Sequence, residues 1–90
     1  MSEKDFSNYT ILVVDDVPLN LVLVEKMLGR YNFNIKKAGG GQQALNMIAE
    51  EAPSVVLLDL MMPNIDGYEV LRRLRSDAST KNLPVIILSA

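Results

Sequence analysis

The sequence VVLLD at positions 55–59 decides the fold, because it is a short apolar run that ends in an acidic residue. Its first four residues are apolar at every position rather than at alternate positions. A strand that is apolar on both faces is typical of a parallel sheet with helices on both sides. The run therefore predicts a buried parallel strand with Asp59 at its carboxyl end.

The same pattern occurs earlier in the chain, where TILVV at positions 10–14 precedes Asp15 and Asp16. Two further segments resemble strands: 33–38, whose lysines indicate a sheet edge, and 85–88. The segments between them carry apolar residues at helical spacing. The expected inward faces are Val17, Leu21, Val24 and Leu28; Ala44, Leu45, Ile48 and Ala52; and Val70, Leu71 and Leu74. Strands that alternate with helices indicate an α/β fold with a parallel sheet.

Length and composition exclude several classes of protein. The 90 residues allow one small domain. A domain of this size with a single core is only marginally stable. The net charge is −2 and the basic residues are scattered, so direct binding to nucleic acid is not expected. No apolar run has the length of a membrane span or a signal peptide, and the absence of cysteine fits a cytoplasmic protein.

The aspartates that follow two strands form the candidate site. The carboxyl ends of parallel strands lie at one edge of the sheet, where open α/β folds bind ligands. If the two strands are neighbours, Asp15, Asp16 and Asp59 converge there. Like charges so close together oppose folding, so such a cluster normally holds a cation. An all-oxygen ligand set in a chain without histidine favours Mg²⁺, with Mn²⁺ as an alternative.

Each aspartate alone is equally consistent with a turn or helix-capping role. Two strands that end in the same way, one of them with paired aspartates, favour a shared site. A carboxylate beside a divalent ion can attack phosphorus and form an aspartyl phosphate, and Asp59 is the candidate nucleophile. The Ser89 hydroxyl could reach a phosphoryl oxygen, although its position alone reads as a polar chain end.

Four motifs in order resemble the response-regulator receiver domains of two-component signalling. They are VVDD at 13–16, LLDLMMP at 57–63, DG at 66–67 and PVIILSA at 84–90. The resemblance covers residues 9–90 and leaves 1–8 as a polar tail. It implies a flavodoxin-like parallel sheet with helices on both faces and strand order 2-1-3-4.

The resemblance also implies roles for single residues. Asp59 would accept a phosphoryl group from a histidine kinase or a small phosphodonor. Asp15, Asp16, Asp59 and the backbone carbonyl of Met61 would bind Mg²⁺, and Ser89 would be the switch hydroxyl. Gly67 would adopt a backbone conformation that other residues resist.

The sequence departs from the family after position 90, where the family continues through a fourth helix, a fifth strand with a lysine, and a fifth helix. We therefore expect a receiver truncated after its fourth strand. Its exposed strand-4 edge or helix faces would favour a homodimer. The alternative function is a signalling-impaired receiver that acts as a dimerisation or interaction module. A third interpretation, a Mg²⁺-dependent phosphohydrolase, is disfavoured because the chain offers no general base beyond the metal ligands and no capping domain to close the site. We therefore expect a phosphoacceptor rather than an enzyme.

Overall fold

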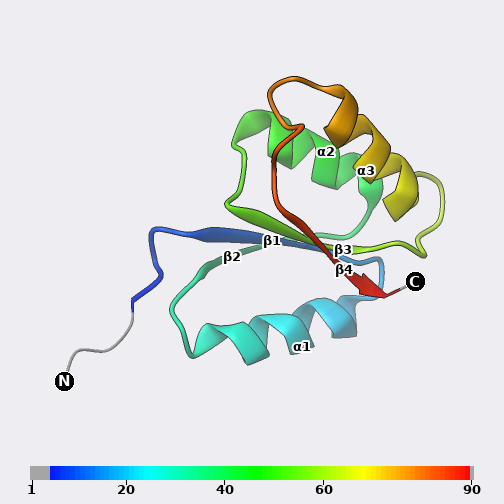
Figure 1. The fold of residues 1–90 in the computed structure, drawn as a ribbon. Coiled ribbons are helices and arrows are strands. Elements are labelled where there is room, and N and C mark those ends of the chain that lie inside the picture. Colours follow the sequence, from blue (N-terminus) through cyan, green and yellow to red (C-terminus); the bar gives the residue numbers. More distant parts are fainter. Residues whose placement is uncertain (1–4, 90) are drawn as a thin grey trace.

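The computed structural model describes residues 5–89, except for the side chain of Ser89. Four strands and three helices alternate along the chain (Figure 1). They are β1 Thr10–Val14, α1 Pro18–Gly29, β2 Asn34–Ala38, α2 Gly41–Glu50, β3 Val55–Asp59, α3 Gly67–Ser76 and β4 Val85–Ser89. The predicted elements are confirmed, with strand ends that differ by a single residue.

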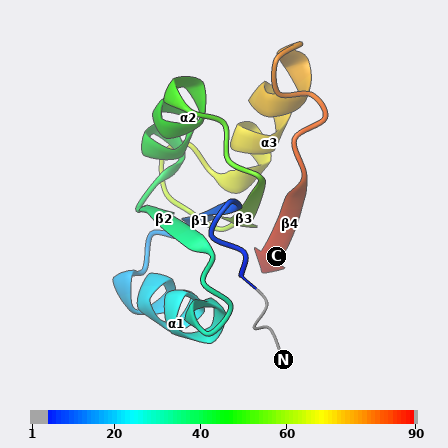
Figure 2. The same cartoon turned by 90° about the vertical axis from the view of Figure 1, so that its left-hand side faces the viewer.

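The strands form one parallel sheet in the order β2-β1-β3-β4. Helix α1 covers one face, and α2 and α3 cover the other (Figures 1 and 2). The flavodoxin-like order and the edge position of the lysine-containing strand β2 are therefore as predicted. Of the two central strands, β1 is buried except for Thr10, and β3 is buried except for the half-buried Val55 and Leu57.

The main core lies between the sheet and the pair α2 and α3. Its most buried members are Leu12, Val14, Ala38, Ala44, Val56, Leu58 and Val70, with Ile48, Leu74 and Met62 also buried. The expected faces of α2 and α3 contribute to it, except Ala52, which follows the end of α2 and is exposed. Hydrophobic burial on this side of the sheet is thus the principal stabilising term.

Helix α1 packs less deeply against the opposite face. Its predicted inward residues Leu21, Val24 and Leu28 are only half-buried, and Val17 is exposed at the N-cap position. The helix is apolar around much of its circumference, since Leu19, Val22, Leu23 and Met27 are also exposed. Within the described residues, no helix is both long enough and apolar enough to cross a lipid bilayer.

Candidate functional site

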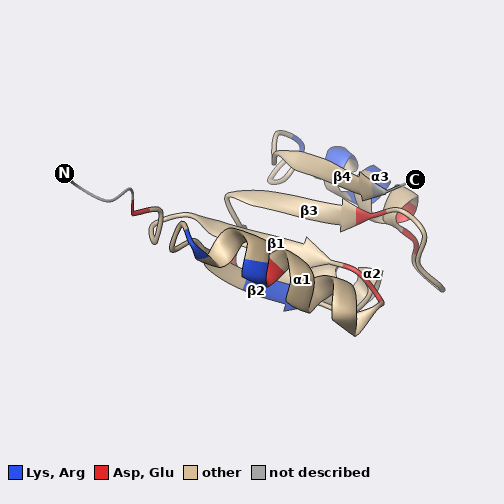
Figure 3. Ribbon diagram, turned by 90° about the horizontal axis from the view of Figure 1, so that it is seen from below, with Lys and Arg blue, Asp and Glu red and all other residues tan. Residues whose placement is uncertain are grey.

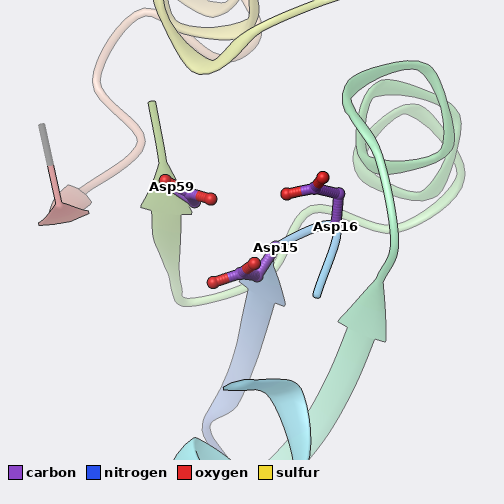
Figure 4. Close-up of side chains that lie close together, drawn as sticks. All are labelled: Asp15, Asp16 and Asp59. Carbon is purple, nitrogen blue, oxygen red and sulfur yellow. The ribbon is translucent and has the colours of Figure 1, made fainter. Parts of the chain in front are cut away.

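The ends of β1 and β3 bring the three predicted aspartates together. Val14 pairs with Leu58 across the two strands, so Asp15 and Asp59 are neighbours at the carboxyl edge of the sheet. One carboxylate oxygen from each of Asp15, Asp16 and Asp59 lies within 4.8 Å of the others (Figure 4). Figure 3 shows red, acidic segments at the ends of the arrows of β1 and β3. The convergence that the strand pattern predicted is therefore present.

Two of the aspartates also have local structural roles. Asp15 Oδ1 accepts a hydrogen bond of 2.9 Å from the Val17 N–H, and Asp59 Oδ1 accepts one of 3.0 Å from the Met61 N–H. Both residues therefore act as turn residues as well. A carboxylate has about four acceptor positions, so such a bond leaves capacity for an ion. The two interpretations of these aspartates are compatible.

Asn20 is a contributor that the sequence did not reveal. Its side-chain amide donates a 3.1 Å hydrogen bond to Asp15 Oδ2 from the first turn of α1. This bond fixes the second oxygen of a buried carboxylate and so orients the group. The only available signal was a polar residue near the start of a helix whose first half is otherwise apolar.

Asp16 differs from its two buried neighbours because it faces an open hollow. The hollow has a volume of about 260 Å³ and lies between the start of α2 and the segment that joins β3 to α3. Of the three aspartates, only Asp16 lines this hollow.

The donor set fits a hard divalent cation. Mg²⁺ binds oxygen atoms at about 2.1 Å, so two oxygens on one ion are at most about 4.2 Å apart. The separations here reach 4.8 Å. A small side-chain movement or a bridging water would close that difference if these residues held the ion. The Met61 backbone carbonyl stays a prediction as a further ligand, and the exposed Met61 side chain takes no part in this arrangement.

The backbone of Ser89 lies beside the proposed phosphoacceptor. Leu58 pairs with Ile87, but Asp59 pairs with Ser89, so β4 carries one extra residue at Leu88. Such a bulge changes which side chain stands opposite a given position. The Ser89 side chain lies outside the described part of the chain, and its role as a switch hydroxyl stays a prediction.

Gly67 was expected to adopt an unusual backbone conformation, and that expectation was wrong. Within residues 5–89, no glycine has a positive φ angle, and Asn64 takes the left-handed conformation in this segment with a φ of 62°. Gly67 is required by space instead. A Cβ atom there would meet the Asp59 carbonyl oxygen and lie 2.6 Å from the Leu60 Cα.

Comparisons with known proteins identify relatives of this chain. The family model for the response regulator receiver domain matches residues 11–90. A probable cyclic di-GMP phosphodiesterase of Vibrio cholerae serotype O1 is 40% identical over 89 residues, which are 99% of this chain and 20% of that protein. The sensor histidine kinase RcsC of Salmonella typhimurium is 42% identical over 80 residues, or 89% of this chain and 8% of the kinase.

Solved structures show the same architecture. The N-terminal domain of a response regulator receiver protein from Methanoculleus marisnigri JR1 matches with a TM-score of 0.84 and 39% identity. The match covers 88% of this chain and 64% of that structure. The chain thus spans about two thirds of that solved structure and about a fifth of the phosphodiesterase.

The chain belongs to the response regulator receiver domain family. Receiver domains are signalling modules of two-component systems, which interact with histidine kinases and bind Mg²⁺ at an acidic cluster. In this chain Asp15, Asp16 and Asp59 lie close together at the ends of β1 and β3.

Proposed function

We propose that Asp59 is the phosphoacceptor of a two-component phosphorelay and receives its phosphoryl group from a histidine kinase. The observation that carries this proposal is the group of three carboxylates within 4.8 Å at the end of β1 and β3. Asp59 stands on the strand between β1 and β4. A phosphoryl group on it would have Asp15 and Asp16 on one side and the backbone of Ser89 on the other.

The proposed transfer needs a nucleophile and compensation for charge. A carboxylate oxygen of Asp59 attacks phosphorus and forms a new P–O bond, while the bond from phosphorus to the donor breaks and its electron pair leaves with the donor. Mg²⁺ or Mn²⁺, when bound, neutralises charge on the phosphoryl oxygens. We assign Asp15, Asp16, Asp59 and the Met61 carbonyl as its protein ligands. Because a histidine kinase draws on cytoplasmic ATP, this partner also implies a cytoplasmic location.

Intact-mass measurement tests the proposal. The protein is incubated with Mg²⁺ and a small acyl phosphate, and one added phosphoryl group is expected on the wild-type chain. Asp59→Asn should take up none, whereas Asp77→Asn, a surface aspartate after α3, should behave as the wild type does. Omission of Mg²⁺ should also abolish uptake.

Other outcomes would separate the alternatives. A folded wild-type protein that takes up no phosphoryl group would contradict the phosphoacceptor role and favour an interaction module. Repeated turnover of a phosphoester would indicate a phosphohydrolase instead of a signalling domain that at most assists its own phosphorylation and dephosphorylation.

We also propose that the 90-residue chain, taken as it stands, forms a homodimer through β4 and α1. Within the described residues, β4 pairs only with β3, and its Ile86, Ile87 and Leu88 are 55%, 41% and 39% exposed. Leu88 of β4 and Leu23 of α1 line the same hollow, and the Leu23 side chain is also exposed. An apolar sheet edge beside an apolar helix is a surface that a second copy can cover.

A further inference from the structure

We propose that Gly41 is a positioning residue for the segment that joins β3 to α3, and this proposal deepens the phosphoacceptor function stated above. Gly41 is the first residue of α2 and is buried. A Cβ atom at this position would meet the backbone carbonyl oxygen of Ile65 and lie 2.8 Å from its Cγ2 and 3.0 Å from its Cβ. Real Cβ contacts essentially never come so close, so any side chain here must displace its neighbour.

Ile65 has little freedom to yield. Its half-buried side chain packs against the main core, which is close-packed and resists displacement. The nearest atom to the added Cβ is a backbone oxygen, which cannot move aside by a change of rotamer. An added methyl group must therefore shift the backbone of this segment or the start of α2.

The segment transmits such a shift to the carboxylates because it is short and tied at both ends. The Met61 N–H donates to Asp59 Oδ1 at 3.0 Å, and the Gly67 N–H donates to the Leu60 carbonyl oxygen at 3.1 Å. A displacement at Ile65 therefore reaches Met61, whose carbonyl is the proposed ligand. Gly41 acts on the site through this backbone, without contact with the ion or the phosphoryl group.

The two preceding glycines provide a matched comparison. A Cβ atom at Gly40 would have nothing within 4 Å, and one at Gly39 would meet only the Gln43 Oε1 atom at 3.8 Å. Neither has a positive φ angle. Of these three adjacent glycines, only Gly41 is required by close packing. Gly40→Ala therefore serves as the control, because it makes the same substitution one position away.

The first test uses the metal-free protein. Backbone amide NMR signals of Met61 and Asp59 should shift clearly in Gly41→Ala and stay in place in Gly40→Ala. Equal shifts in the two variants, or none in Gly41→Ala, would overturn the proposal. This result does not depend on whether the site binds Mg²⁺.

The second test titrates Mg²⁺ against the folded proteins. Loss of support around a metal ligand typically weakens affinity by 10- to 100-fold, so Gly41→Ala should bind Mg²⁺ about tenfold more weakly and Gly40→Ala within about twofold of the wild type. Lower stability of Gly41→Ala with unchanged Mg²⁺ affinity would show a purely structural role. No Mg²⁺ binding by the wild type would contradict the proposed function, and the NMR comparison would still decide the role of Gly41.

A second variant covers the case in which Gly41→Ala does not fold. Combining Gly41→Ala with Ile65→Gly removes two of the close contacts and gives the backbone room to move. The double variant should shift the Met61 signal and bind Mg²⁺ about tenfold more weakly than Ile65→Gly alone. Equal values for these two proteins would overturn the proposal.

Discussion

At the scale of the residue, Asp15, Asp16 and Asp59 carry like charges whose nearest oxygens lie within 4.8 Å. Two of the three are buried, so water screens their repulsion less than it would at the surface. If these aspartates bind Mg²⁺ as proposed, their charges oppose folding without the ion and become its ligands when it is bound. Stability and Mg²⁺ binding should therefore respond in opposite directions when one charge is removed.

Asp16→Asn is expected to stabilise the metal-free protein by about 1 kcal/mol, the energy of two unit charges some 4 Å apart in a strongly screened setting. Asp16 is the most suitable position because it is more accessible than its two partners, so an amide is easily solvated. Urea denaturation without divalent ions measures the change. Asp77→Asn, at a surface position after α3, should bring no such gain.

The same variant should lose its response to Mg²⁺. A concentration ten times the dissociation constant raises the free energy of unfolding of the wild type by about 1.4 kcal/mol. The free energy of unfolding of Asp16→Asn should rise by clearly less at the same Mg²⁺ concentration. Equal gains in the two proteins would show that Asp16 is not a ligand.

The strand pattern was sufficient to predict that the three aspartates converge. It could not predict the residues that support them. Acidic residues after two buried strands meet wherever those strands are neighbours, which is a property of parallel sheets. The contact of Gly41 with Ile65 joins segments distant in sequence, and the bond from Asn20 to Asp15 depends on how α1 is placed after β1. No periodic pattern encodes either contact. Gly67 was identified through its motif, yet close packing rather than a special backbone angle requires it.

At the scale of the element, α3 is stabilised by charges on its outer surface. Glu69 pairs with Arg72 and Arg73 at 2.6 and 2.8 Å. Hydrogen bonds from Arg72, and then from Arg73, lower the pKa of the Glu69 carboxyl to about 2. The folded pKa lies below the ordinary value of 4.5, so the carboxylate stabilises the fold above pH 4.5. That contribution is lost as the pH falls through about 2.

Glu69→Gln is therefore expected to unfold at a slightly lower denaturant concentration than the wild type at pH 7. The difference should shrink between pH 4.5 and pH 2, because the carboxyl takes up its proton near pH 4.5 in the unfolded chain and only near pH 2 in the folded protein. Denaturation midpoints at pH 7, 4 and 2 measure it, with Glu50→Gln on α2 as the comparison. A difference that stays constant with pH would exclude the ion pairs as its cause.

Two elements show where prediction from the pattern stops. The extra residue of β4 at Leu88 brings Ser89 opposite Asp59, whereas simple counting would bring Leu88 there. Bulges arise from the geometry of a strand pair and leave no periodic signal. Helix α1 is apolar on several sides, so periodicity identified Leu21, Val24 and Leu28 but could not show that they are only half-buried.

At the scale of the whole molecule, the apolar surface is distributed unevenly. Helices α2 and α3 cover the sheet on one side, and the core lies there. On the other side α1 lies against β1 and β2, and no helix of the described residues covers β4 (Figure 2). The two faces of one sheet thus differ in how completely they are protected from water.

The uncovered side leads to the prediction that the 90-residue chain self-associates. Size-exclusion chromatography with light scattering should show a mass that rises from monomer to dimer with concentration. Ile86→Lys places a charge in the middle of β4, where the side chain is 55% exposed. Burial of the exposed half of an isoleucine contributes about 1.4 kcal/mol, so this change should weaken association about tenfold or more.

Tyr68→Lys, at an equally exposed position on α3, should leave the dimer intact. A wild-type monomer at every concentration, or equal effects of the two lysines, would contradict an interface through β4.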